Sequence, residues 1–118
     1  MNPLDLFKNE KMTDRYEPGQ IIFKQGQPAD RMYVVKEGEV EIRVGDEVMD
    51  VVGAGDLLGE MALVDSSPRS ATAVARTACS LIPVDQRRFT YLVQQTPFFS
   101  LYVMRVLADR LRRSNTRR

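Results

Sequence analysis

Short apolar runs between glycine-containing turns dominate residues 15–84. Residues 39–44 alternate polar and apolar side chains, which predicts a half-buried strand. Gly45-Asp46 predicts a hairpin from this strand into residues 48–52. Four other apolar runs predict further strands: 20–24, 32–36, 70–75 and 79–84. Short strands between turns about 8–12 residues apart are typical of a sandwich, jelly roll or barrel.

A short helix is predicted before the strands, over residues 3–12, with Leu4, Leu6 and Phe7 as its apolar contacts. Six to eight strands are expected in residues 15–84, followed by two helices. Because the helices are segregated from the strands, the predicted class is mainly β with flanking helices, or α+β. A chain of 118 residues fits a single domain over 1–118.

Two helices are predicted after the strands. Asp85 is a suitable N-cap for a helix over 85–95, and Pro97 separates that helix from a last one over 98–113. The last helix carries an apolar stripe at spacings of three and four residues: Leu101, Met104, Leu107 and Leu111. Such a stripe either packs on its own domain or pairs with a partner helix.

The composition excludes several kinds of site. The chain has no His and one cysteine, Cys79, so it cannot form an internal disulfide, a zinc site of the usual ligands or a histidine-dependent triad. We therefore expect no metal and no catalytic residues. No apolar run approaches the ~20 residues of a membrane span, and the first residues lack the apolar core of a secretory signal. A cytoplasmic location is expected.

The basic residues gather at the end of the chain. Six of the 17 lie between Arg105 and Arg118. A run of this kind can contact nucleic acid or an anionic membrane. The favoured interpretation is a solvated helix end.

Residues 55–74 carry the most informative chemistry. Gly59 allows close approach of the backbone to a ligand, and residues 60–64 suit one helical turn, whose first N–H groups favour an anion. Arg69 offers a planar fork for two phosphate oxygens, and Ser70 adds a hydroxyl donor. Glu60 suits a sugar hydroxyl, with Arg69 near enough to neutralise its charge. The alternative is a surface turn with an exposed Glu60–Arg69 ion pair, and spacing alone does not separate the two.

The two halves of this segment, Gly59-Glu60-Met61-Ala62-Leu63 and Pro68-Arg69-Ser70-Ala71-Thr72, resemble the phosphate-binding cassette of cyclic-nucleotide-binding domains. That family includes the catabolite activator proteins, the regulatory subunits of cyclic-AMP-dependent kinase and the cyclic-nucleotide-gated channels. The resemblance extends over residues 12–113, through positions such as Gly26, Tyr33 and Phe89. It implies an eight-stranded β-roll over 15–84, with the cassette at 59–72 and two C-terminal helices.

The resemblance also implies a role for each residue of the cassette. Arg69 would bind the exocyclic phosphate oxygens, and Glu60 would accept a hydrogen bond from the ribose 2′-hydroxyl. Ser70 would donate to the phosphate or to the base. Backbone groups around the phosphate and ribose would come from four further residues: Gly59, Met61, Ala62 and Ala71. Leu58 stands where the family usually has Phe, a change that should affect only packing.

The last helix resembles the lid helix of the family, which in the receptor proteins also forms the dimer seam. An ungapped comparison from Arg69 places Arg110 and Ser114 where those receptors have base-facing residues. Cyclic AMP is expected in preference to cyclic GMP, because Ser70 stands where guanine-preferring relatives often carry Thr. The expected partners are the nucleotide, a possible second copy through the last helix, and an effector protein that the sequence does not identify.

The expected function is therefore a stand-alone cyclic-nucleotide sensor and not an enzyme. In the receptor proteins the lid helix leads into a helix-turn-helix DNA reader, whereas this sequence ends at Arg118 and has none. Three alternatives remain: an interaction module of the same fold that has lost its ligand, a cupin-like enzyme, and a DNA-binding fragment using the basic end. The lack of His opposes the enzyme.

Overall fold

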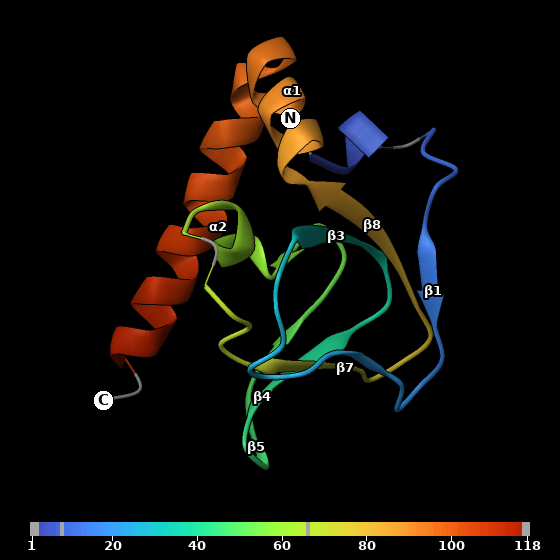
Figure 1. Cartoon of the computed structure of the whole chain (residues 1–118), viewed down its shortest axis with the longest axis vertical. Helices are drawn as coiled ribbons and strands as arrows, with labels where there is room; N and C mark the ends of the chain where they lie inside the picture. Colours follow the sequence, from blue (N-terminus) through green and yellow to red (C-terminus); the bar gives the residue numbers. More distant parts are fainter. Residues whose placement is uncertain (1–2, 8, 66, 117–118) are drawn as a thin grey trace.

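The computed structural model describes residues 3–7, 9–65 and 67–116, with the side chains of 3 and 114–116 left out of the description. Within these residues eight strands form two antiparallel four-stranded sheets, and two helices follow them (Figure 1). One sheet has the order β1-β8-β3-β6 and the other β2-β7-β4-β5. The strands are β1 (Asp14–Tyr16), β2 (Ile21–Phe23), β3 (Arg31–Glu37), β4 (Val40–Val44), β5 (Glu47–Val52), β6 (Leu57–Leu58), β7 (Thr72–Ala75) and β8 (Cys79–Asp85). The predicted eight-stranded β-roll is confirmed.

The β4–β5 hairpin shows how local sequence sets the register. Val44 pairs with Glu47 across the predicted turn at Gly45-Asp46, and Val40 pairs with Val52 at the other end. Gly45 has a φ of 60°, which a glycine adopts without steric cost. β4 pairs on its other side with β7, so it lies inside its sheet.

Strand β3 is buried on both faces, which explains its unbroken apolar run from Met32 to Val35. Side chains alternate across a strand, so Met32 and Val34 join one cluster while Tyr33 and Val35 join the other. The second cluster fills the space between the two sheets, with contributions from β4, β5, β6, β7 and β8. The first lies between the β1-β8-β3-β6 sheet and the helices.

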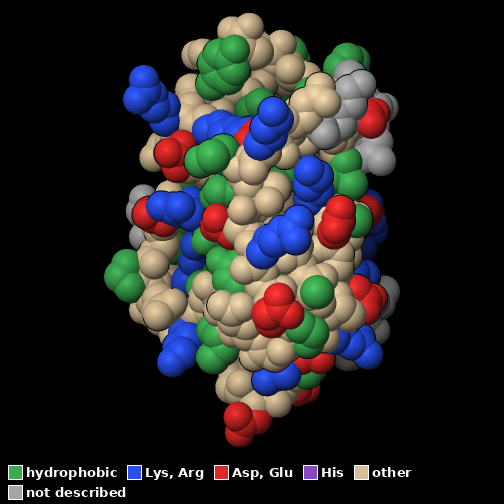
Figure 2. All heavy atoms as spheres, turned by 90° about the vertical axis from the view of Figure 1, so that its right-hand side faces the viewer, with side chains coloured by type: hydrophobic (Ala, Val, Ile, Leu, Met, Phe, Trp, Pro, Cys, Tyr) green, Lys and Arg blue, Asp and Glu red, His purple; other side chains and the backbone are tan. Residues whose placement is uncertain are grey.

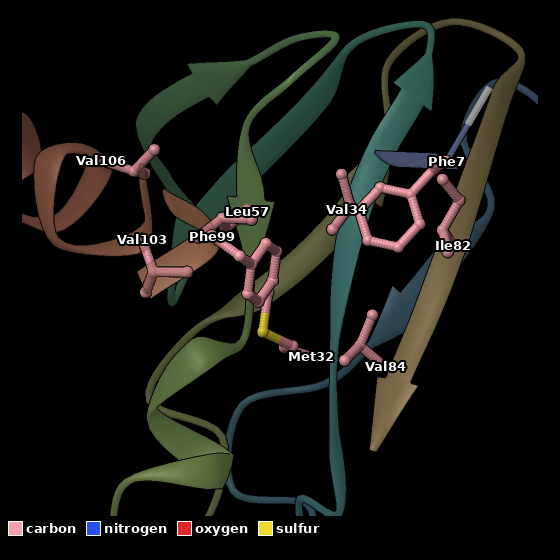
Figure 3. Packing of buried hydrophobic residues seen from close by; sticks show 9 residues of the cluster. All are labelled: Phe7, Met32, Val34, Leu57, Ile82, Val84, Phe99, Val103 and Val106. Atoms are coloured by element: carbon pink, nitrogen blue, oxygen red, sulfur yellow. The ribbon is translucent and has the colours of Figure 1, made fainter. Parts of the chain in front are cut away.

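The first cluster attaches the last helix to the sheet (Figure 3). Helix α2 (Pro97–Thr116) contributes Phe99, Val103 and Val106, which pack with Met32, Val34 and Leu57. Phe99 also makes edge-to-face contacts with Phe7 and with Phe89 of α1 (Gln86–Gln95). Helix α2 therefore runs along one side of the β-roll.

The start of α1 agrees with the prediction. Asp85 has extended backbone angles, and its carboxylate accepts a hydrogen bond from the backbone N–H of Arg88 at 2.8 Å. This is the geometry of an N-cap. Pro97 is the first residue of α2, a position where its missing N–H costs nothing.

The N-terminal helix is shorter than predicted. The structure has a 3-10 helix, η1 (Pro3–Phe7), in place of a helix over 3–12. Beyond Phe7 the chain is held by Glu10, whose carboxylate accepts from the backbone N–H of Met12 and pairs with Arg88. The Lys36 ammonium donates to the Glu10 carbonyl at 3.3 Å. These bonds to β3 and α1 replace the helical bonds that the local pattern favoured.

Two strands were absent from the prediction because they are short: β1 and β6. The strand predicted over 70–75 begins only at Thr72, where pairing with Arg43 of β4 starts. No described helix is long and apolar enough to cross a membrane. On the face opposite α2, acidic and basic side chains are interspersed and hydrophobic ones are scattered (Figure 2).

Candidate functional site

The connection from β6 to β7 forms one wall of a cavity, and residues of β2, β4, β5 and α2 also line it. This connection contains η2 (Glu60–Leu63), a single 3-10 turn that lies beside α2 (Figure 1). The cavity encloses about 140 Å³. Every residue of the predicted cassette site lines it, together with Arg110: Gly59, Glu60, Met61, Ala62, Arg69, Ser70 and Ala71.

Gly59 is required by its conformation and by its neighbour. Its φ of 67° and ψ of 26° lie in the left-handed region, which L side chains rarely adopt. A Cβ atom here would overlap Nη1 of Arg69. The glycine therefore lets the guanidinium lie directly against the backbone, where Nη1 donates to the Gly59 carbonyl at 3.2 Å.

Arg69 is a buried cation without a carboxylate partner among the described residues. Its exposed fraction is 8%, and its Nε–H has no hydrogen-bond partner in the described part of the chain. The guanidinium lies over the ring of Phe23, with 4.1 Å between Cζ and the ring centroid. Burial lowers the pKa of Arg69, although arginine still keeps its charge at neutral pH. Unused N–H donors on a buried cation create a demand for an anion.

Glu60 has a different partner. It is also 8% exposed, and its Oε1 accepts from Nη1 of Arg110 at 2.5 Å. Arg110 lies on α2 and donates a second hydrogen bond to the Leu57 carbonyl. One arginine thus joins the last helix to the strand and the turn that precede the cavity. The second oxygen of Glu60 can still accept a hydrogen bond.

The alternative of a surface turn with an exposed Glu60–Arg69 ion pair is wrong. Both side chains are buried, and the salt bridge of Glu60 goes to Arg110. The sequence did not indicate Arg110 as the partner of Glu60, because Arg110 is close to Glu60 only when α2 is docked on the sheet. Arg110 was expected to face a base; its described bonds go to Glu60 and Leu57. The side chain of Ser114 lies outside the described residues.

The helical turn after Gly59 contributes only a weak dipole to the attraction of an anion. The turn η2 is a four-residue 3-10 turn, so few peptide dipoles add up along it. The described hydrogen bonds leave the backbone N–H groups of Ser70 and Ala71 unused. Attraction for an anion therefore depends on Arg69 and on single N–H groups at the cavity.

Several residues of the cavity were not expected from the sequence. Phe23 and Ile42 come from β2 and β4, and Asp50 comes from β5. Phe23 and Ile42 are far from the cassette in the chain and Asp50 belongs to a separate strand, so the cassette motif could not identify them. No group of three or more His, Cys, Asp or Glu that could bind a metal occurs in the described part of the chain.

The arrangement suits a small ligand with an anionic group and a hydroxyl group. Arg69 presents unused donors to the anion, and Glu60 presents an acceptor. The hydrophobic side chains of Phe23, Ile42 and Met61 line the same cavity, which suits an apolar or aromatic ligand surface.

Comparisons with known proteins agree with this geometry. Residues 13–96 match the family described as cyclic nucleotide-binding domain. The chain is similar to a CRP-like cAMP-activated global transcriptional regulator of Mycobacterium tuberculosis, 32% identical over 82% of this chain and 46% of that protein. It is also similar to the cAMP-dependent protein kinase regulatory subunit of Eremothecium gossypii, 38% identical over 75% of this chain and 19% of that protein.

A solved structure extends the likeness to the fold. The catabolite activator protein of Thermus thermophilus superposes with a TM-score of 0.80, at 29% identity, over 97% of this chain and 56% of that one. The chain therefore spans about half, or less, of the length of these relatives. Since the family match covers more than two thirds of the residues and includes the whole cavity wall from Gly59 to Ala71, the chain belongs to the cyclic nucleotide-binding domain family.

Proposed function

We propose that this domain binds cyclic AMP, in preference to cyclic GMP, as a regulatory ligand. The observation that carries the proposal is the buried Arg69, which has unused donors and no carboxylate partner among the described residues. A cyclic phosphate supplies the missing negative charge and accepts in the plane of the guanidinium. Two relatives, named as a cAMP-activated regulator and a cAMP-dependent kinase subunit, support the adenine nucleotide.

Glu60 and Ser70 complete the proposed site. The free oxygen of Glu60 accepts from the ribose 2′-hydroxyl, while Arg110 keeps the other oxygen. Ser70 is exposed at the cavity and donates to the phosphate or to the base. Ser70 stands where guanine-preferring relatives often carry Thr, and this is the basis for preferring adenine over guanine.

The last helix is proposed to act as a lid. A cavity of about 140 Å³ is smaller than the ~300 Å³ at the lower end of small-molecule sites, and Arg110 lines it. We therefore expect nucleotide binding to move Arg110 and the adjoining part of α2. Such a movement is a switch only if the ligand binds the two positions with different affinity.

Helix α2 is also proposed to pair with a second copy of the chain. Leu101, Met104 and Leu111 are exposed on α2. Their spacing of three and seven residues places them on one face of the helix. The recurrence of apolar residues at such spacings is the pattern of helix pairing. A lid that also forms an interface would transmit nucleotide binding to the partner subunit.

Calorimetric titration tests the central proposal. We expect saturable binding of cyclic AMP, weaker binding of cyclic GMP and no comparable binding of 5′-AMP, whose phosphate is not cyclic. In Arg69→Ala the affinity should fall at least about 30-fold, because loss of a buried charged partner costs roughly 2–5 kcal/mol. Arg69→Lys should recover only part of it, since an ammonium lacks the bidentate fork.

A control variant separates binding from folding. Arg105→Ala changes an exposed arginine of α2 and should keep the wild-type affinity. Wild-type affinity in Arg69→Ala would rule out the proposed phosphate site. Absence of binding by the wild-type chain to either cyclic nucleotide would instead favour an interaction module that has lost its ligand.

A further inference from the structure

Phe23 ends strand β2 and carries the guanidinium of Arg69 on its ring. The distance of 4.1 Å from Cζ to the ring centroid is well within the ~6 Å range of a cation–π contact. The same ring stacks with Tyr33 of β3, with centroids 6.4 Å apart and planes at 17°. Phe23 also packs against the buried cluster between the sheets. The position of the ring is therefore held by contacts other than the one with Arg69.

The turn after Phe23 holds the backbone of Arg69. The Arg69 N–H donates to the Gln27 carbonyl at 2.9 Å, and the Gly26 N–H donates to the Arg69 carbonyl at 2.8 Å. The adjacent Gln25 N–H donates to the hydroxyl of Thr72, at 2.9 Å. Both backbone groups of Arg69 are thus bonded to a turn that starts two residues beyond Phe23.

One continuous segment, residues 23–27, therefore fixes both ends of Arg69. The turn sets the position of its Cα, and the ring sets the plane of its guanidinium. This restraint matters because the arginine side chain has many rotamers, and ordering a long side chain costs conformational entropy. A bidentate contact needs the plane in one orientation. A side chain that is already ordered loses less freedom when it binds.

We propose that Phe23 is a positioning residue for the anion site. It orients the guanidinium so that the N–H edge faces the cavity, in addition to the apolar surface that its ring gives to the cavity wall. The proposal rests on the proposed function for its effect on nucleotide affinity. It rests on the structure alone for the ring-to-guanidinium stack. The alternative is that Phe23 contributes only apolar packing, as a leucine would.

Phe23→Leu removes the aromatic face and keeps an apolar side chain. We expect its affinity for cyclic AMP to fall about three- to tenfold, the range of a partly buried cation–π contact. The methyl triester of cyclic AMP has a neutral phosphate, so its affinity should change much less. The ratio of the two affinities is the decisive quantity, because a packing defect would weaken both ligands equally. Phe23→Tyr keeps the ring face and should retain the wild-type ratio.

Phe89→Leu is the matched control. Phe89 is also half-buried and also in contact with another aromatic ring, but it does not line the cavity. It should lower the denaturation midpoint while leaving the affinity ratio unchanged. An equal loss for both ligands in Phe23→Leu, or unchanged affinity for both, would overturn the proposal.

A measurement without nucleotide keeps this test separate from the proposed function. The ring current of Phe23 should displace the side-chain N–H resonances of Arg69 in the spectrum of the free chain. Phe23→Leu should remove that displacement, and Phe23→Tyr should keep it. Identical Arg69 resonances in the wild type and in Phe23→Leu would overturn the stack, whether or not a nucleotide binds. Failure of the wild type to bind either cyclic nucleotide would overturn the proposed function and, with it, the proposed role of Phe23 in binding.

Discussion

Two buried charged side chains at the cavity, Glu60 and Arg69, are stabilised in different ways. Glu60 has a charged partner in Arg110, so its carboxylate is compensated within the chain. Among the residues that the structure describes, Arg69 contacts the Phe23 ring and the Gly59 carbonyl but no carboxylate. Burying a charge without a partner is costly. An external negative charge would therefore be stabilised by Arg69, whereas Glu60, whose charge is already compensated, can accept a hydrogen bond from a hydroxyl group.

Substitution of Glu60 tests whether its carboxylate contacts the ribose hydroxyl. Glu60→Gln keeps an acceptor oxygen, so we expect a modest loss of cyclic AMP affinity. Glu60→Ala removes the acceptor and leaves the half-buried Arg110 without its carboxylate partner, and we expect about a tenfold or larger loss. Titration with cyclic AMP and its 2′-deoxy analogue gives the measurement. Wild type should discriminate against the deoxy analogue, and Glu60→Ala should discriminate little.

The discrimination is the control within that experiment. A structural defect would weaken both ligands in parallel and keep their ratio. If Glu60→Ala discriminated as strongly as the wild type does, Glu60 would not contact the ribose.

The residues predicted from the cassette lie together in the structure. Every cassette residue that was predicted from residues 59–71 lines the cavity, because these residues are close in the chain and their backbone is shaped by Gly59. The bond between Glu60 and Arg110 joins residues 50 positions apart. It depends on the docked position of α2, which no local pattern specifies. The contact of Phe23 with Arg69 was missed for the same reason.

At the scale of elements, α2 shows where periodicity is ambiguous. The predicted stripe of Leu101, Met104, Leu107 and Leu111 has a regular helical spacing, yet only Leu107 packs against the buried cluster. Helix α2 docks instead through Phe99, Val103 and Val106, which have the same kind of spacing. A helix with two apolar stripes can bury either one. By contrast, Asp85 carries a specific capping bond and located the start of α1 correctly.

The exposed stripe gives a prediction about oligomeric state. Met104 is 56% exposed, so Met104→Glu should leave the fold intact while placing a charge in the proposed seam. We expect sedimentation analysis to show a dimer for the wild type and mainly a monomer for this variant. Tyr91→Glu on α1 is the matched control, since Tyr91 is also apolar and exposed, and it should remain dimeric. A wild type that stays monomeric at all accessible concentrations would exclude pairing through α2.

At the scale of the whole molecule, the fold depends on two layers that share one sheet. Strands β3 and β8 contribute to both buried clusters, so damage to either cluster is transmitted to the other. The class of the fold and six of the strands followed from the sequence, because glycine turns limit strand length, whereas the short strands β1 and β6 were missed. The pairing order of the strands did not, because it depends on contacts between distant residues, such as Tyr16 with Cys79. Two partly buried tyrosines lie in different parts of the domain, Tyr16 on β1 and Tyr102 on α2, and the titration of their phenols depends on the packing around them.

The free energy of unfolding should fall between about pH 10 and pH 12. Burial raises the pKa of Tyr102 to about 12, with the charge of Asp56 adding to the effect. Burial, with a contribution from Tyr33, raises that of Tyr16 to about 12. In the unfolded chain both phenols titrate near pH 10. Above that pH the unfolded state has lost protons that the folded state keeps, so this contribution to stability is fully present below pH 10 and declines as pH rises.

Urea midpoints at pH 8, 10 and 11 measure the decline, which should be smaller in Tyr102→Phe and in Tyr16→Phe than in the wild type. Tyr91→Phe changes an exposed tyrosine and should follow the wild-type curve. Equal declines in all four proteins would show that neither buried phenol is responsible.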